Sequence, residues 1–206
     1  MMNLKEKFTD LCLLFSKDQD LINRFWQEIE KKYSEKGRYY HDLFHLENMF
    51  LELETVKEHL KDPVAISFSV FYHDIIYDAS SKSNEEKSAW RAAERLQQLG
   101  LNSEMISKIS SQILATKSHQ LSDDSDTNYL LDADLSILGK DFEVYLDYTR
   151  KIRKEYSIYP DLLYKPGRRK VLNHFLELES IFKTTDFRDR YEQQARENIA
   201  AELQLL

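Results

Sequence analysis

The chain has 206 residues, the usual length of one domain, and its 42% hydrophobic residues can form a substantial core, so wholesale disorder is excluded. Four Gly and three Pro are too few for a β-sandwich or barrel with many tight turns. The formal net charge of −7 argues against a protein that binds large nucleic acids by neutralising phosphates. It leaves room for a local basic pocket that binds one small phosphorylated ligand.

We expect a cytoplasmic protein without a membrane-spanning segment. The single cysteine, Cys12, can form no internal disulfide, as is usual in a reducing compartment. Near the N-terminus the only apolar run covers residues 11–15, and the longer apolar stretch 66–77 contains His73 and Asp74. Because a membrane-spanning helix needs about 20 apolar residues, the longer stretch is predicted to be a buried helix.

Helical spacing of apolar residues predicts an all-α fold, a single compact multi-helix domain over residues 1–206 with its core at about 20–200. In chain order, the expected helices cover residues 18–36, 43–60, 64–76, 84–99, 103–117, 127–138, 142–156, 167–182 and 187–205. Gly37, Gly100 and Gly139 are expected to end the helices that precede them. Ser83 and Glu86 have the spacing of a capping box, and residues 78–83 and 118–126 are expected to be loops.

Asp134 is the first ionisable residue predicted in apolar surroundings. On a helical wheel of about 100° per residue, Leu130, Leu131 and Ile137 fall within about 60° of it. Asp132 lies about 160° away and is expected to point outward or towards a helix end. A carboxylate in the core must be protonated, satisfied by an arginine or a capping amide, or bound to a metal ion.

His73 and Asp74 lie together in the apolar stretch, where Ile66, Val70 and Ile76 share the wheel face of His73. A buried histidine with one satisfied hydrogen bond is common, whereas a buried His-Asp dipeptide is not. Adjacent residues on a helix diverge by about 100°, yet both side chains can reach one ion packed against that edge.

His41 and His45 are the next candidates. If the helix extends back to His41, the two imidazoles are at i and i+4 on one face, a spacing found in metal sites but weak evidence when isolated. His119 follows an expected helix end, and it could bind substrate or a second ion. His59 and His174 lie in ordinary amphipathic segments and are assigned no chemistry.

In order along the chain, His45, His73-Asp74 and Asp134 form an H…HD…D pattern. With its three local motifs, at residues 38–45, 71–78 and 131–136, the chain resembles the HD superfamily of metal-dependent phosphohydrolases. The resemblance covers about residues 20–200 and is greatest to small stand-alone bacterial proteins described only as predicted phosphohydrolases.

The resemblance implies an all-α domain in which His45, His73, Asp74 and Asp134 hold one divalent metal ion. Such a ligand set suits Mn²⁺, Fe²⁺, Co²⁺, Ni²⁺ or Mg²⁺ and is compatible with Zn²⁺. The first motif is also similar to the Tyr-His-Asn-x-x-His stretch of cyclic-nucleotide phosphodiesterases, which implies that His41 is a general acid. In this chain an aspartate replaces the asparagine, so specificity for cyclic nucleotides does not follow.

The implied reaction is the attack of a metal-activated water on a phosphoester of a small metabolite, with a nucleotide as the expected substrate. Arg38, Lys117, His119 and Arg153 are the candidate phosphate-binding residues, and Arg168 and Arg169 are further ones. Each of these cations except Arg38 could equally be a solvated surface residue.

Two carboxylates near the HD motif could support the reaction. Asp74 is a candidate for direct participation, and Glu85 or Asp78 could orient the water or a histidine. Glu85 could also be a helix-capping acid, and Asp78 a loop carboxylate.

Two other classes of protein remain open. One is a non-catalytic module in which the metal pocket senses a nucleotide or holds the fold together. The other is a structural helical protein without metal, in which the buried polar groups satisfy one another. The sequence does not predict the oligomeric state.

Overall fold

In the computed structural model, which describes residues 2–206, the fold is made of ten α-helices and two short 3-10 helices, with no strand among those residues. The all-α prediction is thereby confirmed. The helices are α1 (Leu4–Leu13), α2 (Gln19–Tyr33), α3 (Leu43–Glu54), η1 (Lys57–His59), α4 (Pro63–Tyr72), α5 (Asn84–Leu99), α6 (Ser103–Ala115), α7 (Ser125–Leu135), η2 (Ser136–Gly139), α8 (Phe142–Glu155), α9 (Asp161–Glu177) and α10 (Thr185–Leu205). None of the helices in this range is long and apolar enough to cross a membrane.

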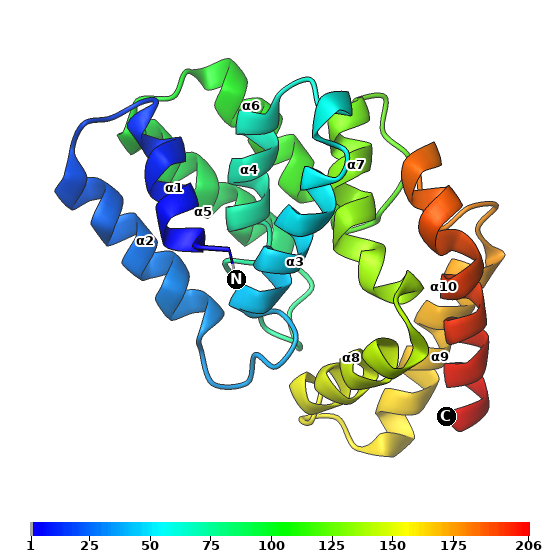
Figure 1. Cartoon of the computed structure of the whole chain (residues 1–206). Coiled ribbons are helices and arrows are strands. Elements are labelled where there is room, and N and C mark those ends of the chain that lie inside the picture. Colours follow the sequence, from blue (N-terminus) through cyan, green and yellow to red (C-terminus); the bar gives the residue numbers. More distant parts are fainter. Residues whose placement is uncertain (1) are drawn as a thin grey trace.

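Helix α4 occupies the centre of the fold. It packs against α1, α3, α5, α6 and α7 and is buried on nearly all sides, as expected for a helix without a polar face. Helices α8, α9 and α10 form a second group beside this bundle, and α10 packs against η2 and α9 (Figure 1). The two groups meet where α3 begins and α8 ends, and the candidate site lies there.

Most helix starts follow the expected capping chemistry. The carboxylates of Asp18, Asp42 and Asp62 and the amide oxygen of Asn102 accept backbone N–H groups in the first turns of α2, α3, α4 and α6. The predicted capping box at Ser83 is wrong, because the Ser83 side chain makes no capping hydrogen bond at the start of α5.

Several helix ends also differ from the prediction. Helix α4 ends at Tyr72 instead of residue 76, and α3 ends at Glu54 and is followed by η1. Helix α9 begins at Asp161 instead of residue 167, because the chain is already helical before Pro166: the N–H group of Tyr164 donates to the Pro160 carbonyl. Helix α1 was not predicted.

The side chain of Asp132 is completely buried, so the expectation that it points outward is wrong. It accepts hydrogen bonds from the backbone N–H groups of Lys183 and Thr184, both at 2.7 Å, and from the Thr184 hydroxyl. These groups begin α10, so the other expectation, that Asp132 points towards a helix end, is correct. The buried carboxylate attaches α10 to α7.

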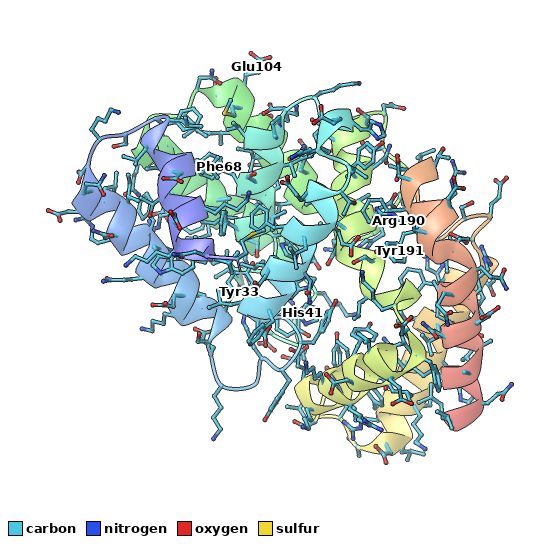
Figure 2. All side chains as sticks on the ribbon, viewed as in Figure 1. Tyr33, His41, Phe68, Glu104, Arg190 and Tyr191 are labelled. Carbon is cyan, nitrogen blue, oxygen red and sulfur yellow. The ribbon has the colours of Figure 1, made fainter. Side chains whose placement is uncertain are left out.

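Gly139 at the end of η2 allows α10 to approach closely. A Cβ atom at this position would lie 2.5 Å from Tyr191 Cβ, 2.7 Å from its carbonyl oxygen and 2.9 Å from its Cα atom. Tyr191 lies on the side of α10 that faces the main bundle (Figure 2). Two of these three contacts are with backbone, which a rotamer change cannot relieve.

We therefore expect Gly139→Ala to lower the free energy of unfolding by about 1–3 kcal/mol through overpacking. Urea denaturation of both proteins measures the change. Gly167→Ala is the matched control: a Cβ at this helical position meets nothing within 4 Å, so the substitution should stabilise the chain by about 0.5–1 kcal/mol. Equal stabilities of Gly139→Ala and the natural protein would contradict this interpretation of the contact.

Candidate metal centre

Three residues, His45, His73 and Asp74, each offer a ligand atom within 4.8 Å of the others, and together they could hold a metal ion. The Nε2 atoms of the two histidines are 3.2 Å apart, and His73 Nε2 is 3.2 Å from Asp74 Oδ2. Asp134 is not part of this group of three but lies next to its histidines, with its Oδ1 atom 3.2 Å from His45 Nε2 and 3.9 Å from His73 Nε2. The four residues that the sequence singled out as metal ligands therefore lie together.

His73 and Asp74 reach the same place because the chain leaves the helix there. His73 is the C-terminal cap of α4, and residues 74–78 are not helical. Two adjacent residues on a helix would diverge, whereas here the Asp74 carboxylate turns back to His73.

Arg38 satisfies the backbone of this irregular segment. Its guanidinium donates to the carbonyls of Asp74 at 2.7 Å, Ile75 at 3.0 Å and His41 at 3.1 Å, and it lies 4.8 Å from the centroid of the Tyr33 ring. The Tyr33 hydroxyl accepts the Asp74 N–H. The two terminal nitrogens of Arg38 are thus engaged by carbonyl oxygens and shape the HD segment, and its role in binding a substrate phosphate stays a prediction.

His45 is positioned by the start of α3. The Asp42 carboxylate accepts the N–H groups of Phe44 and His45 and so caps the helix, which begins at Leu43. His41 thus precedes the helix, and the expected i, i+4 pair of histidines on one helical face is wrong. The two imidazoles are nevertheless neighbours, with ring centroids 5.7 Å apart.

The protonation of His73 fits a cation site. Its Nδ1 atom lies 2.9 Å from the Val70 carbonyl and donates to it, which directs Nε2 towards Asp74 and His45. Burial alone would lower the pKa of His73, but the carboxylates of Asp74 and Asp134 raise it to about 9. The buried carboxylates thus attract positive charge, which a divalent cation would supply in place of the His73 proton.

His119 is the fifth polar residue at this place. Its Nε2 atom is 2.9 Å from Asp134 Oδ2, whereas the other oxygen of this carboxylate, Oδ1, is the one that lies near His45. It has a positive φ of 50°, which is uncommon for a residue other than glycine and directs the loop after α6 into the site. His119 therefore orients the Asp134 carboxylate.

His41 is held by a residue that the sequence did not point to, Glu155 at the end of α8. The Glu155 Oε2 atom lies 2.6 Å from His41 Nδ1, and Oε1 accepts the backbone N–H groups of Tyr39, Tyr40 and His41. The Nε2 atom of His41 lies 3.9 Å from Asp74 Oδ2. His41 therefore lies between α3 and α8, with one nitrogen bound and the other towards the candidate metal centre (Figure 2).

The His41–Glu155 pair shifts the pKa of both groups. Burial lowers the pKa of His41, but the hydrogen bond to Glu155 and the charges of Asp74 and Glu155 outweigh it, so the pKa lies above its usual value. Burial raises the pKa of Glu155, but the hydrogen bonds and charge of His41 lower it to about 2. Each shift favours the charged form of its group. The sequence did contain a signal for Glu155, because Tyr148, Ile152 and Glu155 follow a helical spacing of four and three residues and so share one face of the helix.

Glu155 should make stability depend on pH in the acid range. Its folded pKa of about 2 lies below the ordinary value of 4.5, so its contribution is present above pH 4.5 and is lost as the pH falls towards 2. We expect Glu155→Gln to cost about 3 kcal/mol near pH 6 and progressively less below pH 4.5. Urea denaturation at a series of pH values measures the difference. A difference that stays constant down to pH 3 would contradict this assignment.

A pocket of about 1020 Å³ opens beside the candidate metal centre, between the main bundle and helices α8 and α9. His41 and His119, which contact Asp74 and Asp134, line this pocket, and Glu85 lines it too. The Glu85 side chain makes no hydrogen bond or ion pair within the described chain, and its catalytic role stays a prediction. Asp78 is exposed and accepts two hydrogen bonds from Ser80, as a loop carboxylate does.

The other predicted phosphate-binding cations are engaged by protein groups. Lys117 lines the pocket but pairs with Glu86 and donates to the Lys82 carbonyl. Arg168 also lines it, and its guanidinium forms a two-pronged pair with Glu202 at 2.7 and 2.9 Å.

Arg153 and Arg169 do not line this pocket. Arg153 binds Asp161 and two carbonyls, and Arg169 donates to the Leu203 carbonyl. The donors of Arg153 are directed to the turn that follows α8, and its role in binding phosphate stays a prediction.

Comparison of the chain with protein-family models, curated proteins and solved structures found no match. The function therefore has to be inferred from the side-chain geometry of this molecule.

Proposed function

We propose that the protein is a metal-dependent phosphohydrolase of the HD type, which cleaves a phosphoester of a small phosphorylated metabolite, with a nucleotide as the substrate class. The observation that supports this proposal is the cluster of His45, His73 and Asp74, with Asp134 next to His45. These residues come from three separate parts of the chain. A large pocket lies beside the cluster, since His41 and His119, which line the pocket, contact Asp74 and Asp134.

The donor set fits a divalent ion. Two ligand atoms about 2.1 Å from a shared ion lie about 3 Å apart when their bonds are at right angles, and the closest pairs of donors here are 3.2 Å apart. We propose that two imidazoles and two carboxylates hold the ion, and that His119 orients Asp134. An ion bound there would lower the pKa of a water molecule and polarise a phosphoryl oxygen.

His41 would supply the proton for the leaving oxygen. Its Nδ1 atom is bound to Glu155, so Nε2 is the nitrogen available to a substrate in the pocket. The negative charge of Glu155 raises the pKa of the imidazole and so favours its protonated form, which a general acid requires, and the hydrogen bond fixes the orientation of the ring. The pocket is large enough for a substrate of nucleotide size.

Metal binding is tested first. We expect the purified chain to bind a divalent ion and to be stabilised by it: an ion at 100 times its dissociation constant should raise the free energy of unfolding by about 2.7 kcal/mol. Elemental analysis and thermal denaturation with Mn²⁺, Co²⁺, Ni²⁺, Mg²⁺ or Zn²⁺, each against a chelator, measure this. A chain that binds none of them would reject the proposed metal centre.

Turnover is tested by phosphate release. A screen of nucleotides and other phosphoesters with each metal should identify at least one substrate that releases phosphate. Binding of both metal and nucleotide without phosphate release would instead indicate a non-catalytic sensor. The two experiments thus separate the enzyme from the two other classes of protein.

A further inference from the structure

Five aromatic side chains line the part of the pocket that is formed by the C-terminal helices. They belong to the end of α8, the turn after it and α9: Tyr148, Tyr156, Tyr159, Tyr164 and Phe175. The rings of Tyr156 and Tyr159 lie 6.3 Å apart at an angle of 29°, and Tyr164 lies 6.2 Å from Tyr156. Three tyrosine rings thus form one connected surface.

Tyr164 separates two cavities. Its ring lines both the large pocket and a smaller one on the other side, whereas Arg153 lines only the smaller one. The Arg153 guanidinium lies 4.6 Å from the centroid of the Tyr164 ring. The Arg153 guanidinium therefore covers the side of the Tyr164 ring that faces the smaller cavity, and the remainder of the ring borders the large pocket.

Arg153 also fixes the turn that carries the other tyrosines. It donates to the carbonyls of Tyr156 and Tyr159, both at 3.1 Å, and to the Asp161 carboxylate at 2.8 and 3.0 Å. Glu155, two residues further on, holds His41. The last turn of α8 thus positions both the proposed general acid and the aromatic surface.

Polar groups border this surface. Lys170 and His174 lie one helical turn apart on α9 and line the same pocket. Within residues 2–206, neither side chain makes a hydrogen bond or an ion pair. An aromatic surface beside such groups suits a planar ring that carries polar atoms at its edge, because the ring stacks on the tyrosines while its edge accepts hydrogen bonds.

We infer that Tyr156, Tyr159 and Tyr164 form a subsite that binds a planar heterocyclic ring on the leaving-group side of the phosphoester, and that Arg153 is a positioning residue for it. This inference rests on the proposed function in placing a phosphoester at the metal end of the pocket. The ring subsite itself needs no metal ion, since none of its residues contacts the candidate metal ligands.

Binding of nucleosides to the chelator-treated full-length chain tests the subsite separately from turnover, because nucleosides carry no phosphate. Adenosine, guanosine, cytidine and uridine are titrated by calorimetry, with ribose as the probe that lacks a ring of this kind. At least one nucleoside should bind saturably and ribose should not. Tyr159→Leu should weaken binding about 5- to 150-fold, which corresponds to the 1–3 kcal/mol typical of one base stacked on an aromatic side chain.

Three variants complete the experiment. Tyr159→Phe keeps the ring and should bind as the natural chain does, whereas Tyr164→Leu should weaken binding and replaces Tyr159→Leu if that variant fails to fold. Trp90→Leu removes an exposed aromatic ring outside the pocket and should have no effect. Thermal denaturation checks each fold. Equal binding by the natural chain and both leucine variants, or no saturable binding of any nucleoside, would overturn the subsite whether or not phosphate release is observed.

Discussion

Replacing Asp74 with Ala will abolish metal-dependent phosphate release and weaken metal binding. A residue that only supports a ligand typically costs about 10–100-fold in metal affinity, and we expect the loss of Asp74 to cost more than that. The carboxylate lies 3.2 Å from His73 Nε2 and is one of the three residues best placed to share an ion. Its backbone groups, which hold Arg38 and Tyr33, are unchanged by the substitution. We therefore expect the helical content to stay the same.

Elemental analysis, metal-dependent thermal shifts and circular dichroism measure these effects, and the phosphoester found in the screen measures turnover. Asp78→Ala is the matched control, because it removes an exposed carboxylate four residues away whose partner is only Ser80. It should keep metal binding. If Asp74→Ala binds metal and releases phosphate as the natural chain does, the assignment of Asp74 is wrong.

Replacing Glu155 with Gln will lower kcat by about 10²-fold or more while metal binding is retained. The amide carries no charge to keep His41 protonated, so the proton donor is lost from a larger fraction of molecules. Glu155 contacts none of the four proposed ligands, since its bonds go to residues 39–41 and to the Tyr77 hydroxyl. Metal content should thus be equal in both proteins.

The pH profile of kcat distinguishes this role from a structural one. Because Glu155 raises the pKa of His41, its removal should shift the alkaline limb of the profile to lower pH. Glu202→Gln is the control: it breaks another buried ion pair, with Arg168, and should destabilise the chain without moving that limb. An unshifted limb in Glu155→Gln would show that His41 does not act as the general acid.

Local sequence was sufficient to predict the all-α class and most helix starts. Aspartate and asparagine caps act on N–H groups within a few residues, so their effect does not depend on distant parts of the chain. The end of α4 was predicted wrongly because distant groups replace local hydrogen bonds there. Helix α4 was expected to reach residue 76, but the segment after Tyr72 is held by Arg38 and Ser88 side chains from other elements.

His73, Asp74 and Asp134 could be singled out because an ionisable group in an apolar pattern requires a partner, whereas the full ligand set with His45 came from the resemblance to the HD superfamily. Helical periodicity indicates which side of a helix is buried but not which group it meets there. For Asp132 the sequence therefore left two alternatives open, and only the fold decided that its carboxylate is buried against the start of α10.

The partners of Arg38 and His41 were decided only when the chain folded. The carboxylate of Glu155 is 114 residues from His41 in sequence, and the Arg38 guanidinium meets carbonyls 36 and 37 residues away. A charged side chain looks alike in sequence whether it meets a ligand, a carbonyl or solvent, because its cost of burial depends on which polar groups the fold brings within about 3 Å of it.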